Sequence, residues 1–429
     1  MLYTILLLLP LPLLIFIIRR KHHLYCLPPF VALNGIYIFI IVGSFEVIRD
    51  ERLFSDVYYY SLLLIITSFY FFYIVAFSFG KNLYINWRVT NYSSADKRVI
   101  VPLLVCLWGF SFLMFYLYYQ RHGLPAVFDV SLFDYNDLYK IRAEKSTDLP
   151  EGVHWYALAF QTTPAFIFCY TYIWKHLIVT PKTKIIFYCN LPLVLFFSAL
   201  TMHKSFFAYL VLHMLLIDVL MIGSFNLRKL LGYFAIGTST IIIMLRFYLL
   251  DRGTMDVLKL VPDYFYQRIF VTYTSAHAYI VQIFPNKHDY FYGTAFGNPG
   301  HMLPYEPVSL PQFLGYWING VLENYSSPSF SQGYANFGFV GLILIILFMF
   351  FQITLLQAVF KKFSKNPLFF SLYVLVVPQM LWYAVTSIQQ VISEIFILWC
   401  VAYIFIYYLL RNFMTGLRRH KCAHNTYLG

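Results

Sequence analysis

Residues 334–357 read YANFGFVGLILIILFMFFQITLLQ, and this stretch decides the fold class of the chain. It contains no Lys, Arg, Asp or Glu, and a helix of about 20 such residues crosses the hydrocarbon core of a bilayer. Lys361, Lys362 and Lys365 follow it, and an excess of basic residues marks the cytoplasmic end of a membrane span. The stretch therefore predicts a transmembrane helix whose carboxyl end faces the cytoplasm.

The composition extends this prediction to the whole chain. Of its 429 residues, 60% are hydrophobic and only 12% are charged, whereas soluble domains carry roughly 25% charged residues. Within a bilayer a helix satisfies its own backbone polar groups, and the apolar runs here have helical length. We therefore expect an all-α, polytopic integral membrane protein that forms a single membrane domain over residues 1–429.

Eleven apolar runs predict eleven spans. They are 2–18, 28–47, 57–79, 99–119, 153–174, 185–202, 205–225, 231–249, 334–357, 367–386 and 391–410. The first run lacks a basic leader and a small-residue cleavage site, so we interpret it as a retained helix and not as a signal peptide. The basic residues 19–21 follow it, which places the N-terminus outside and, after eleven spans, the C-terminus in the cytoplasm.

The distribution of charge agrees with this orientation. The predicted cytoplasmic segments are 19–27, 80–98, 175–184, 226–230, 358–366 and 411–429. They hold 19 of the 31 Lys and Arg residues, and their only acid is Asp96. Nearly all other acids fall in external segments or adjoining helix ends, with Asp218 as the exception. The net charge of +12 is thus explained by topology, and no nucleic-acid partner is implied.

Three of the predicted external segments are informative, two loops and one tight turn around 203–204. The loops are 120–152 and 250–333, and the second precedes the ninth helix. Its semi-apolar pieces, 257–284 and 310–325, suit short helices lying in the membrane interface. A twelfth span at 269–284 would place Lys361, Lys362 and Lys365 outside, so the basic residues argue against it.

Basic residues near the outer surface are the first candidates for a site. Lys204 lies in the turn between two spans, where almost no linker separates the helices, so its charge is fixed and suits a lipid phosphate. Snorkelling without a ligand is the alternative. Guanidinium groups bind phosphates through paired donors, and salt bridges or headgroup contacts are their alternative role. The arginine candidates are Arg142, Arg246, Arg252 and Arg268.

Two residues are the leading candidates for a general base. Glu323 and His301 lie in the large external loop, and either side chain has the chemistry to take the proton of an attacking sugar hydroxyl. His277, His288 and Glu306 are further candidates, and a hydrogen-bonded loop residue is the commoner role for any of these. The sequence contains no Walker loop, no dinucleotide fingerprint and no His-Glu-x-x-His motif, and its six cysteines show no metal-site spacing. We therefore expect no metal and no cofactor.

Three features resemble the bacterial O-antigen or oligosaccharide repeat-unit polymerases. They are the tight turn 200–205, the late external loop of about 80 residues that begins with arginines, and the sequence YANFGFVG at 334–341. The resemblance implies a metal-independent membrane glycosyltransferase at the outer face of the bacterial cytoplasmic (inner) membrane. Its substrates are oligosaccharide repeats carried on undecaprenyl diphosphate. By position, Lys204, Arg252 and Arg268 match basic residues at that family's lipid-diphosphate site.

The resemblance also sets the alternatives. A ligase that moves finished polysaccharide onto the lipid A core shares the layout and the donor. A flippase or transporter of lipid-linked sugar usually has short loops and buried acids along a path, which are scarce here. A structural membrane subunit would not need arginines clustered at outer helix ends. A chain-length regulator and a flippase are possible partners, and the product is a lipopolysaccharide, a capsule or another surface glycan.

Overall fold

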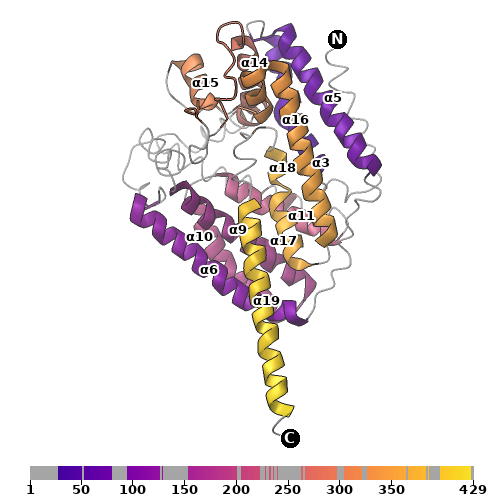
Figure 1. Ribbon diagram of the computed structural model, residues 1–429, viewed down its shortest axis with the longest axis vertical. Coiled ribbons are helices and arrows are strands. Elements are labelled where there is room, and N and C mark those ends of the chain that lie inside the picture. Colours follow the sequence, from indigo (N-terminus) through magenta and orange to yellow (C-terminus); the bar gives the residue numbers. More distant parts are fainter. Residues whose placement is uncertain are drawn as a thin grey trace. The chain divides into compact units, whose positions relative to one another are not determined.

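The computed structural model describes residues 28–50, 53–79, 94–125, 128, 153–200, 204–222, 228, 231–232, 235, 239, 262–263, 266–296, 304–320, 325, 327–363, 366–382, 385 and 397–426. All regular elements in this part of the chain are helices (Figure 1), and it contains no strand. Two short elements are π-helical, η2 (Tyr37–Ile41) and η5 (Gln267–Val271). The predicted helical fold is confirmed for the described part of the chain.

Nine of the predicted spans coincide with described helices. These are α3–η2–α4 (Pro28–Ile36, Tyr37–Ile41, Val42–Arg49), α5 (Asp56–Phe79), α6 (Ser94–His122), α9 (Val153–Leu177), α10 (Pro181–Ala199), α11 (Lys204–Ile222), α16 (Ser329–Phe363), α17 with α18 (Pro367–Val376, Gln379–Trp382) and α19 (Ile397–Thr426). By length and composition, four helices are long and apolar enough to cross a membrane: Val31–Arg49, Asp96–His122, Pro181–Ala199 and Ser329–Phe363. Run 2–18 lies outside the described residues, and so does most of run 231–249.

Local capping explains several helix boundaries. Thr180 and Thr183 form a capping box at the start of α10, where Pro181 occupies the first helical position. Ser55 accepts a hydrogen bond from the Tyr58 amide (3.1 Å) and caps α5. Helix α15 (Leu310–Asn319) ends at Gly320, whose φ of 71° is in the left-handed region that glycine adopts without strain.

The chain divides into two compact units, and each is described by itself. Unit 1 comprises Met1–Ile85, Leu258–Lys362 and Val377–Ile395, and unit 2 comprises Asn86–Val257, Phe363–Val376 and Phe396–Gly429. In unit 1, helix α14 (Thr272–Ile283) packs against α4, α5 and η2. In unit 2, α9 is the central helix and contacts α6, α10, α11, α17 and α19.

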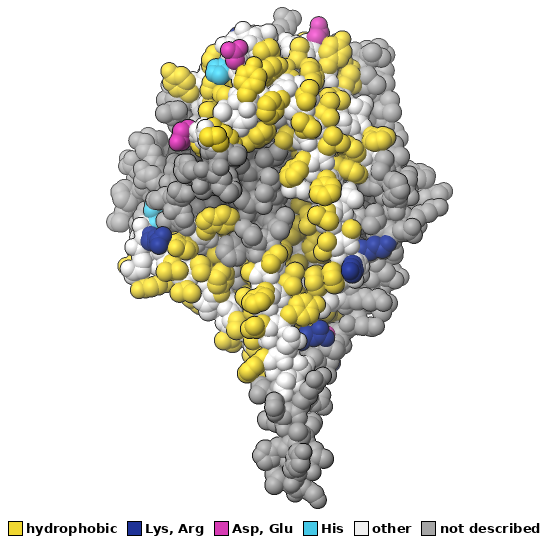
Figure 2. All heavy atoms as spheres, in the orientation of Figure 1, with side chains coloured by type: hydrophobic (Ala, Val, Ile, Leu, Met, Phe, Trp, Pro, Cys, Tyr) yellow, Lys and Arg dark blue, Asp and Glu magenta, His cyan; other side chains and the backbone are white. Residues whose placement is uncertain are grey.

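Several helices expose apolar side chains along a whole face. On α16 an exposed stripe follows the helical repeat, with side chains such as Val340, Leu344, Phe351 and Leu355. Similar faces occur on α6 and α10, and hydrophobic side chains dominate the visible described surface (Figure 2). Apolar faces of this size are costly in water and are expected where lipid is the solvent.

Two predicted spans differ in detail from the structure. In α16 the backbone leaves helical geometry at Phe337 (φ −144°) and Gly338 (φ 61°), so the straight helix begins after this kink and not at Tyr334. The predicted span 367–386 is interrupted between α17 and α18 at Val377–Pro378. Proline has no amide hydrogen to donate and its ring crowds the preceding turn, which explains this interruption.

Candidate functional site

The structure describes only part of the predicted site. Lys204 is the first residue of α11 and Arg268 the second residue of η5, and their side chains lie outside the described part. The other predicted site residues, Arg142, Arg246, Arg252, His301 and Glu323, lie outside the described residues. Lys204 belongs to unit 2 and Arg268 to unit 1. The surroundings of each are therefore built separately.

The turn before Lys204 is anchored in a buried cluster of unit 2. Helix α10 ends at Ala199 and α11 begins at Lys204, so four residues connect the helices where the predicted spans leave two, and Lys204 itself is helical. Leu200, at the start of this connection, is fully buried together with Phe160, Phe197 and Tyr118. Since the cluster joins α6, α9 and α10, it fixes where the turn emerges. Lys204 begins α11 four residues after this buried Leu200.

A second cation lies at the end of α6 beside the same cluster. The Arg121 guanidinium carbon is 5.3 Å from the centre of the Tyr156 ring, a cation–π arrangement. Tyr118, three residues earlier on α6, belongs to the buried cluster. Unit 2 therefore carries both Arg121 and the Lys204 turn on the helices that this cluster joins.

In unit 1, close packing fixes the backbone around Arg268. A Cβ atom added to Gly43 would overlap the carbonyl oxygen of Phe270, so only glycine permits this approach between α4 and η5. The Thr274 hydroxyl donates to the carbonyls of Phe39 (3.1 Å) and Ile40 (2.9 Å), which lie in the other π-helix. π-helical segments leave carbonyls out of the regular ladder and occur frequently at functional sites.

Charged residues surround the start of η5. The Tyr266 hydroxyl donates to Glu46 (2.6 Å), and Glu46 also lies 3.7 Å from the Arg49 guanidinium. The hydrogen bond to the Glu46 carboxylate raises the pKa of Tyr266 above its ordinary value of 10.0. This exposed group sits at the end of α4, which the sequence places at the outer surface. The hydrogen bond between Tyr266 and Glu46 therefore places Glu46 and Arg49 beside η5, the segment that contains Arg268.

The loop after α14 is held against the start of α16. The Asn336 side-chain oxygen accepts hydrogen bonds from the amides of Gly293 (2.8 Å) and Ala295 (3.2 Å). Its own backbone carbonyl accepts from the Tyr292 amide (3.2 Å). The kink at Gly338 lies directly beyond, and a Cβ there would come within 2.8 Å of the Tyr290 hydroxyl oxygen. The YANFGFVG sequence thus organises this loop besides beginning the span.

A pocket of about 330 Å³ opens between α5 and the end of α14. Its lining residues are Ser55, Val57, Val281, Gln282, Asn286 and Lys287. The volume lies at the lower end of the ~300–1,000 Å³ range of small-molecule sites. Four of the six side chains carry hydrogen-bonding groups, and Lys287 carries the only charge.

His277 is a structural residue in the core of unit 1. Its Nδ1 lies 2.9 Å from the Ser331 hydroxyl and its Nε2 lies 2.8 Å from the Ser61 hydroxyl. Because Ser61 donates its hydrogen to the Tyr58 carbonyl (2.6 Å), Nε2 must donate to Ser61 and Nδ1 must accept from Ser331. The neutral ring therefore joins α5, α14 and α16, and neither nitrogen is available to take a substrate proton.

This arrangement predicts a pH-dependent stability. Burial lowers the pKa of His277 from 6.5 to about 3, so below pH 6.5 the unfolded state binds a proton that the folded state does not. Stability must then fall as the pH is lowered through this window, by about 1 kcal/mol between pH 7 and 5.5. Chemical denaturation of the purified protein at pH 7 and pH 5.5 measures this fall in the free energy of unfolding. We expect His277→Gln to have a lower free energy of unfolding at pH 7. Between pH 7 and 5.5 it should lose about 1 kcal/mol less than the wild type. Equal pH slopes for both proteins would contradict a neutral, buried His277.

His288 and Glu306, the other two candidates for a general base that the structure describes, differ in their surroundings. The His288 ring packs against Phe284, Phe291 and Phe313, and its Nδ1 lies 2.6 Å from the Asp289 carbonyl oxygen. Glu306 is exposed to solvent. His288 therefore holds the loop after α14 in place, whereas Glu306 remains accessible.

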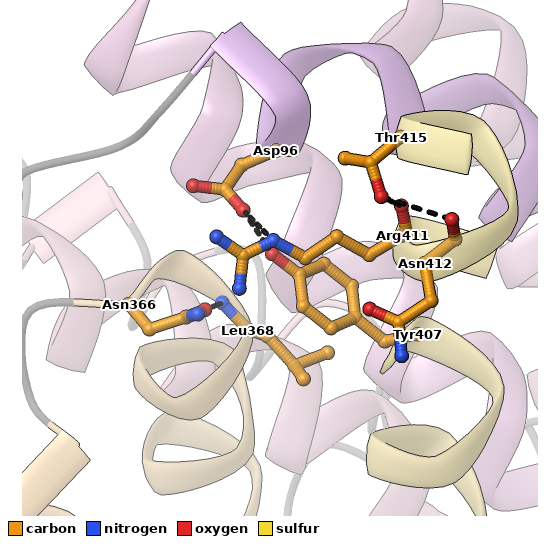
Figure 3. Close-up of polar contacts among 7 residues, drawn as sticks. All are labelled: Asp96, Asn366, Leu368, Tyr407, Arg411, Asn412 and Thr415. Carbon is orange, nitrogen blue, oxygen red and sulfur yellow. Dashed lines mark hydrogen bonds and ion pairs between the residues drawn. The ribbon is translucent and has the colours of Figure 1, made fainter. Parts of the chain in front are cut away.

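Two buried carboxylates connect helices of unit 2. Figure 3 shows the Asp96 carboxylate of α6 facing two residues of α19, the Tyr407 hydroxyl (2.5 Å) and the Arg411 guanidinium (Nε at 3.4 Å). Asp218 of α11 accepts a hydrogen bond from Tyr172 (3.1 Å) and lies 3.4 Å from His176 Nε2, both on α9. Asp96 and Arg411 belong to segments that the sequence assigns to the cytoplasmic side. The pair thus joins the first turn of α6 to the middle of α19, which begins at Ile397 and continues to Thr426, beyond the predicted span 391–410.

Sequence reasoning missed the pocket residues and the His277 network. Serine, glutamine and asparagine are frequent in loops, so only their convergence in space marks them, whereas Lys287 could have been found as a basic residue in the large external loop. Within the described ranges, no group of three or more His, Cys, Asp or Glu side chains is placed to hold a metal ion. No protein-family model, no curated protein and no solved structure matches the chain.

Proposed function

We propose that this chain is a bacterial membrane glycosyltransferase that polymerises oligosaccharide repeat units carried on undecaprenyl diphosphate. The observation that carries the proposal is the turn at Lys204. This turn is short, and Leu200 anchors it in the buried cluster of α6, α9 and α10. The ammonium of this lysine is proposed to be a fixed cation at the outer surface, and fixed cations suit the diphosphate of a lipid carrier.

The proposed chemistry needs charge stabilisation and a base. A hydroxyl at the non-reducing end of one lipid-linked repeat attacks the anomeric carbon of the growing chain. The bond from that carbon to the diphosphate oxygen breaks, and undecaprenyl diphosphate leaves with the bonding electrons. Lys204, Arg252 and Arg268, with Arg142 and Arg246, are proposed to stabilise the charge that develops on the leaving group. Glu323 or His301 is proposed to accept the hydroxyl proton.

The proposed topology has eleven spans, with the N-terminus outside and the C-terminus in the cytoplasm. Contacts within unit 2 support it. Asp96 meets Arg411, and both residues come from segments with a predicted cytoplasmic location. His176, also in such a segment, meets Asp218 near the end of α11. In unit 1, Glu46 near the outer end of α4 meets Tyr266 of the external loop.

A reporter fused after Lys365 tests the orientation. The reporter combines two enzymes, one active only in the cytoplasm and one active only outside it. We expect the cytoplasmic signal from a fusion after Lys365. The reason is that Lys361, Lys362 and Lys365 remain on the cytoplasmic side of the ninth span. A fusion after Asn286 is the matched control and should report the outer side. An external signal after Lys365 would contradict the eleven-span topology.

The experiment that tests the function is the surface-glycan profile of a deletion strain on a gel. We expect a single repeat on the anchor with no ladder, because polymerisation is lost while ligation continues, and we expect the wild-type gene to restore the ladder. Polymer accumulating on the carrier lipid, with no glycan on the anchor, would instead identify a ligase. An unchanged ladder in a strain without a redundant enzyme would contradict both and leave a transporter or structural role.

A further inference from the structure

The pocket between α5 and the end of α14 contains the groups of a sugar-binding site. Gln282 and Asn286 carry amides, each with donors and an acceptor, and Ser55 carries a hydroxyl. The Ser55 oxygen accepts from the Tyr58 amide, so its hydrogen points elsewhere and can be donated to a ligand. The exposed Val57 side chain supplies an apolar surface for the C–H groups of a sugar ring, whereas Val281 is buried.

The pocket is built on a fixed backbone. The amides of Lys287 (2.7 Å) and His288 (3.1 Å) both donate to the Ile283 carbonyl, which closes the chain into a tight turn after α14. Phe284 is fully buried beneath this turn, and its ring lies 5.9 Å from that of Phe313. Asn286 and Lys287 are exposed on the opposite side. A turn anchored in this way presents its polar side chains without a large ordering cost.

The charge of the pocket selects an anionic ligand. Lys287 is the only charged lining residue, and the lining contains no carboxylate. Asp56 lies between two lining residues in the sequence, but its exposed side chain does not line the pocket. An ammonium group beside two amides suits one carboxylate among several hydroxyls.

We propose that this pocket binds a sugar that bears a carboxylate, as part of the acceptor repeat unit. Lys287 pairs with the carboxylate, while Gln282, Asn286 and Ser55 bind hydroxyl groups. The assignment of this sugar to the repeat unit rests on the proposed function, whereas the binding itself does not. The pocket would then select acidic repeat units over neutral ones.

Two matched sugars test the proposal on the purified full-length protein. Methyl β-glucuronide and methyl β-glucoside differ only at the carboxylate, and saturation-transfer NMR titration measures the affinity of each. We expect the glucuronide to bind about tenfold more tightly, the effect of one charge-assisted hydrogen bond. Lys287→Met should remove this preference and Lys287→Arg should retain most of it, while Lys361→Met, the matched control on α16, should leave it unchanged.

Three results would overturn the proposal: no binding of either sugar by folded protein, equal affinity for both sugars, or an undiminished preference in Lys287→Met. The gel of the deletion strain separates this site from the proposed function. Absent binding together with a lost ladder removes the pocket and leaves the polymerase. A selective pocket together with an unchanged ladder upholds the pocket and removes the polymerase.

Discussion

Lys204→Ala is expected to abolish the polymer ladder when it replaces the wild-type gene in a deletion strain, leaving single repeats on the anchor. Leu200 is buried directly after α10 and Lys204 begins α11, and in the proposed mechanism the Lys204 ammonium stabilises the leaving diphosphate. Removing one preorganised charge from a transition state typically lowers a rate by about 10²–10³. A loss of this size leaves too few transfers for a ladder. The same gel, with an immunoblot of the membrane fraction, measures the result.

The controls separate chemistry from folding. Lys182→Ala removes an exposed lysine from the other end of α10 and should keep the full ladder. Lys204→Arg keeps the charge in a different geometry and should restore part of the ladder. A normal ladder from Lys204→Ala at wild-type protein amount would remove Lys204 from the site. If Lys204→Ala is missing from the membrane, Lys204→Arg at normal amount decides. A partial or lost ladder sustains the role of Lys204, and a full ladder contradicts a geometric requirement there.

The sequence predicted the helices because their signal is local. A run of about 20 apolar residues has few stable alternatives in a bilayer. Helices α5, α6, α9, α10 and α11 accordingly begin and end within a few residues of the predicted spans. The interruption before α18 could have been predicted from Pro378. The α16 kink was harder to predict, because Gly333, Gly338 and Gly341 also suit close helix packing.

The contacts that position the site are not local. His277 lies 216 residues from Ser61, and Asp96 lies 311 residues from Tyr407, so no pattern along the chain relates them. Nothing along the sequence marks Asn336 either, and its role appears only in the structure, where its side-chain oxygen accepts a hydrogen bond from the Gly293 amide. The short connection before Lys204 was therefore predictable, because two apolar runs leave almost no linker between them, and the role of Lys204 stays a prediction. The pocket was not predictable, because separate segments converge there.

Gly43→Ala is expected to be among the most destabilising single-methyl changes in unit 1. The new Cβ would overlap the Phe270 carbonyl oxygen and come within 2.8 Å of the Thr274 hydroxyl oxygen. The first obstacle is backbone, so relief requires α4 and η5 to separate. Overpacking a tight contact costs about 1–3 kcal/mol and more where the backbone must move, which corresponds to a fall in thermal midpoint on the order of 10 °C. Thermal unfolding of the purified protein measures it.

The same substitution should also reduce polymerisation, because η5 carries Arg268. A shift of about 1 Å in a positioning segment is enough to lower a rate about 10²-fold. Gly109→Ala is the matched control, since no atom lies within 4 Å of a Cβ added there. In the middle of α6, alanine should hold or raise stability by up to about 1 kcal/mol. Equal stability for Gly43→Ala and Gly109→Ala, together with a full ladder for both, would show that α4 and η5 are not in the close contact that fixes the backbone of Arg268. A stable Gly43→Ala protein with a shortened ladder would instead locate the effect in the placement of Arg268, because the fold would then have absorbed the added methyl group and the site would not.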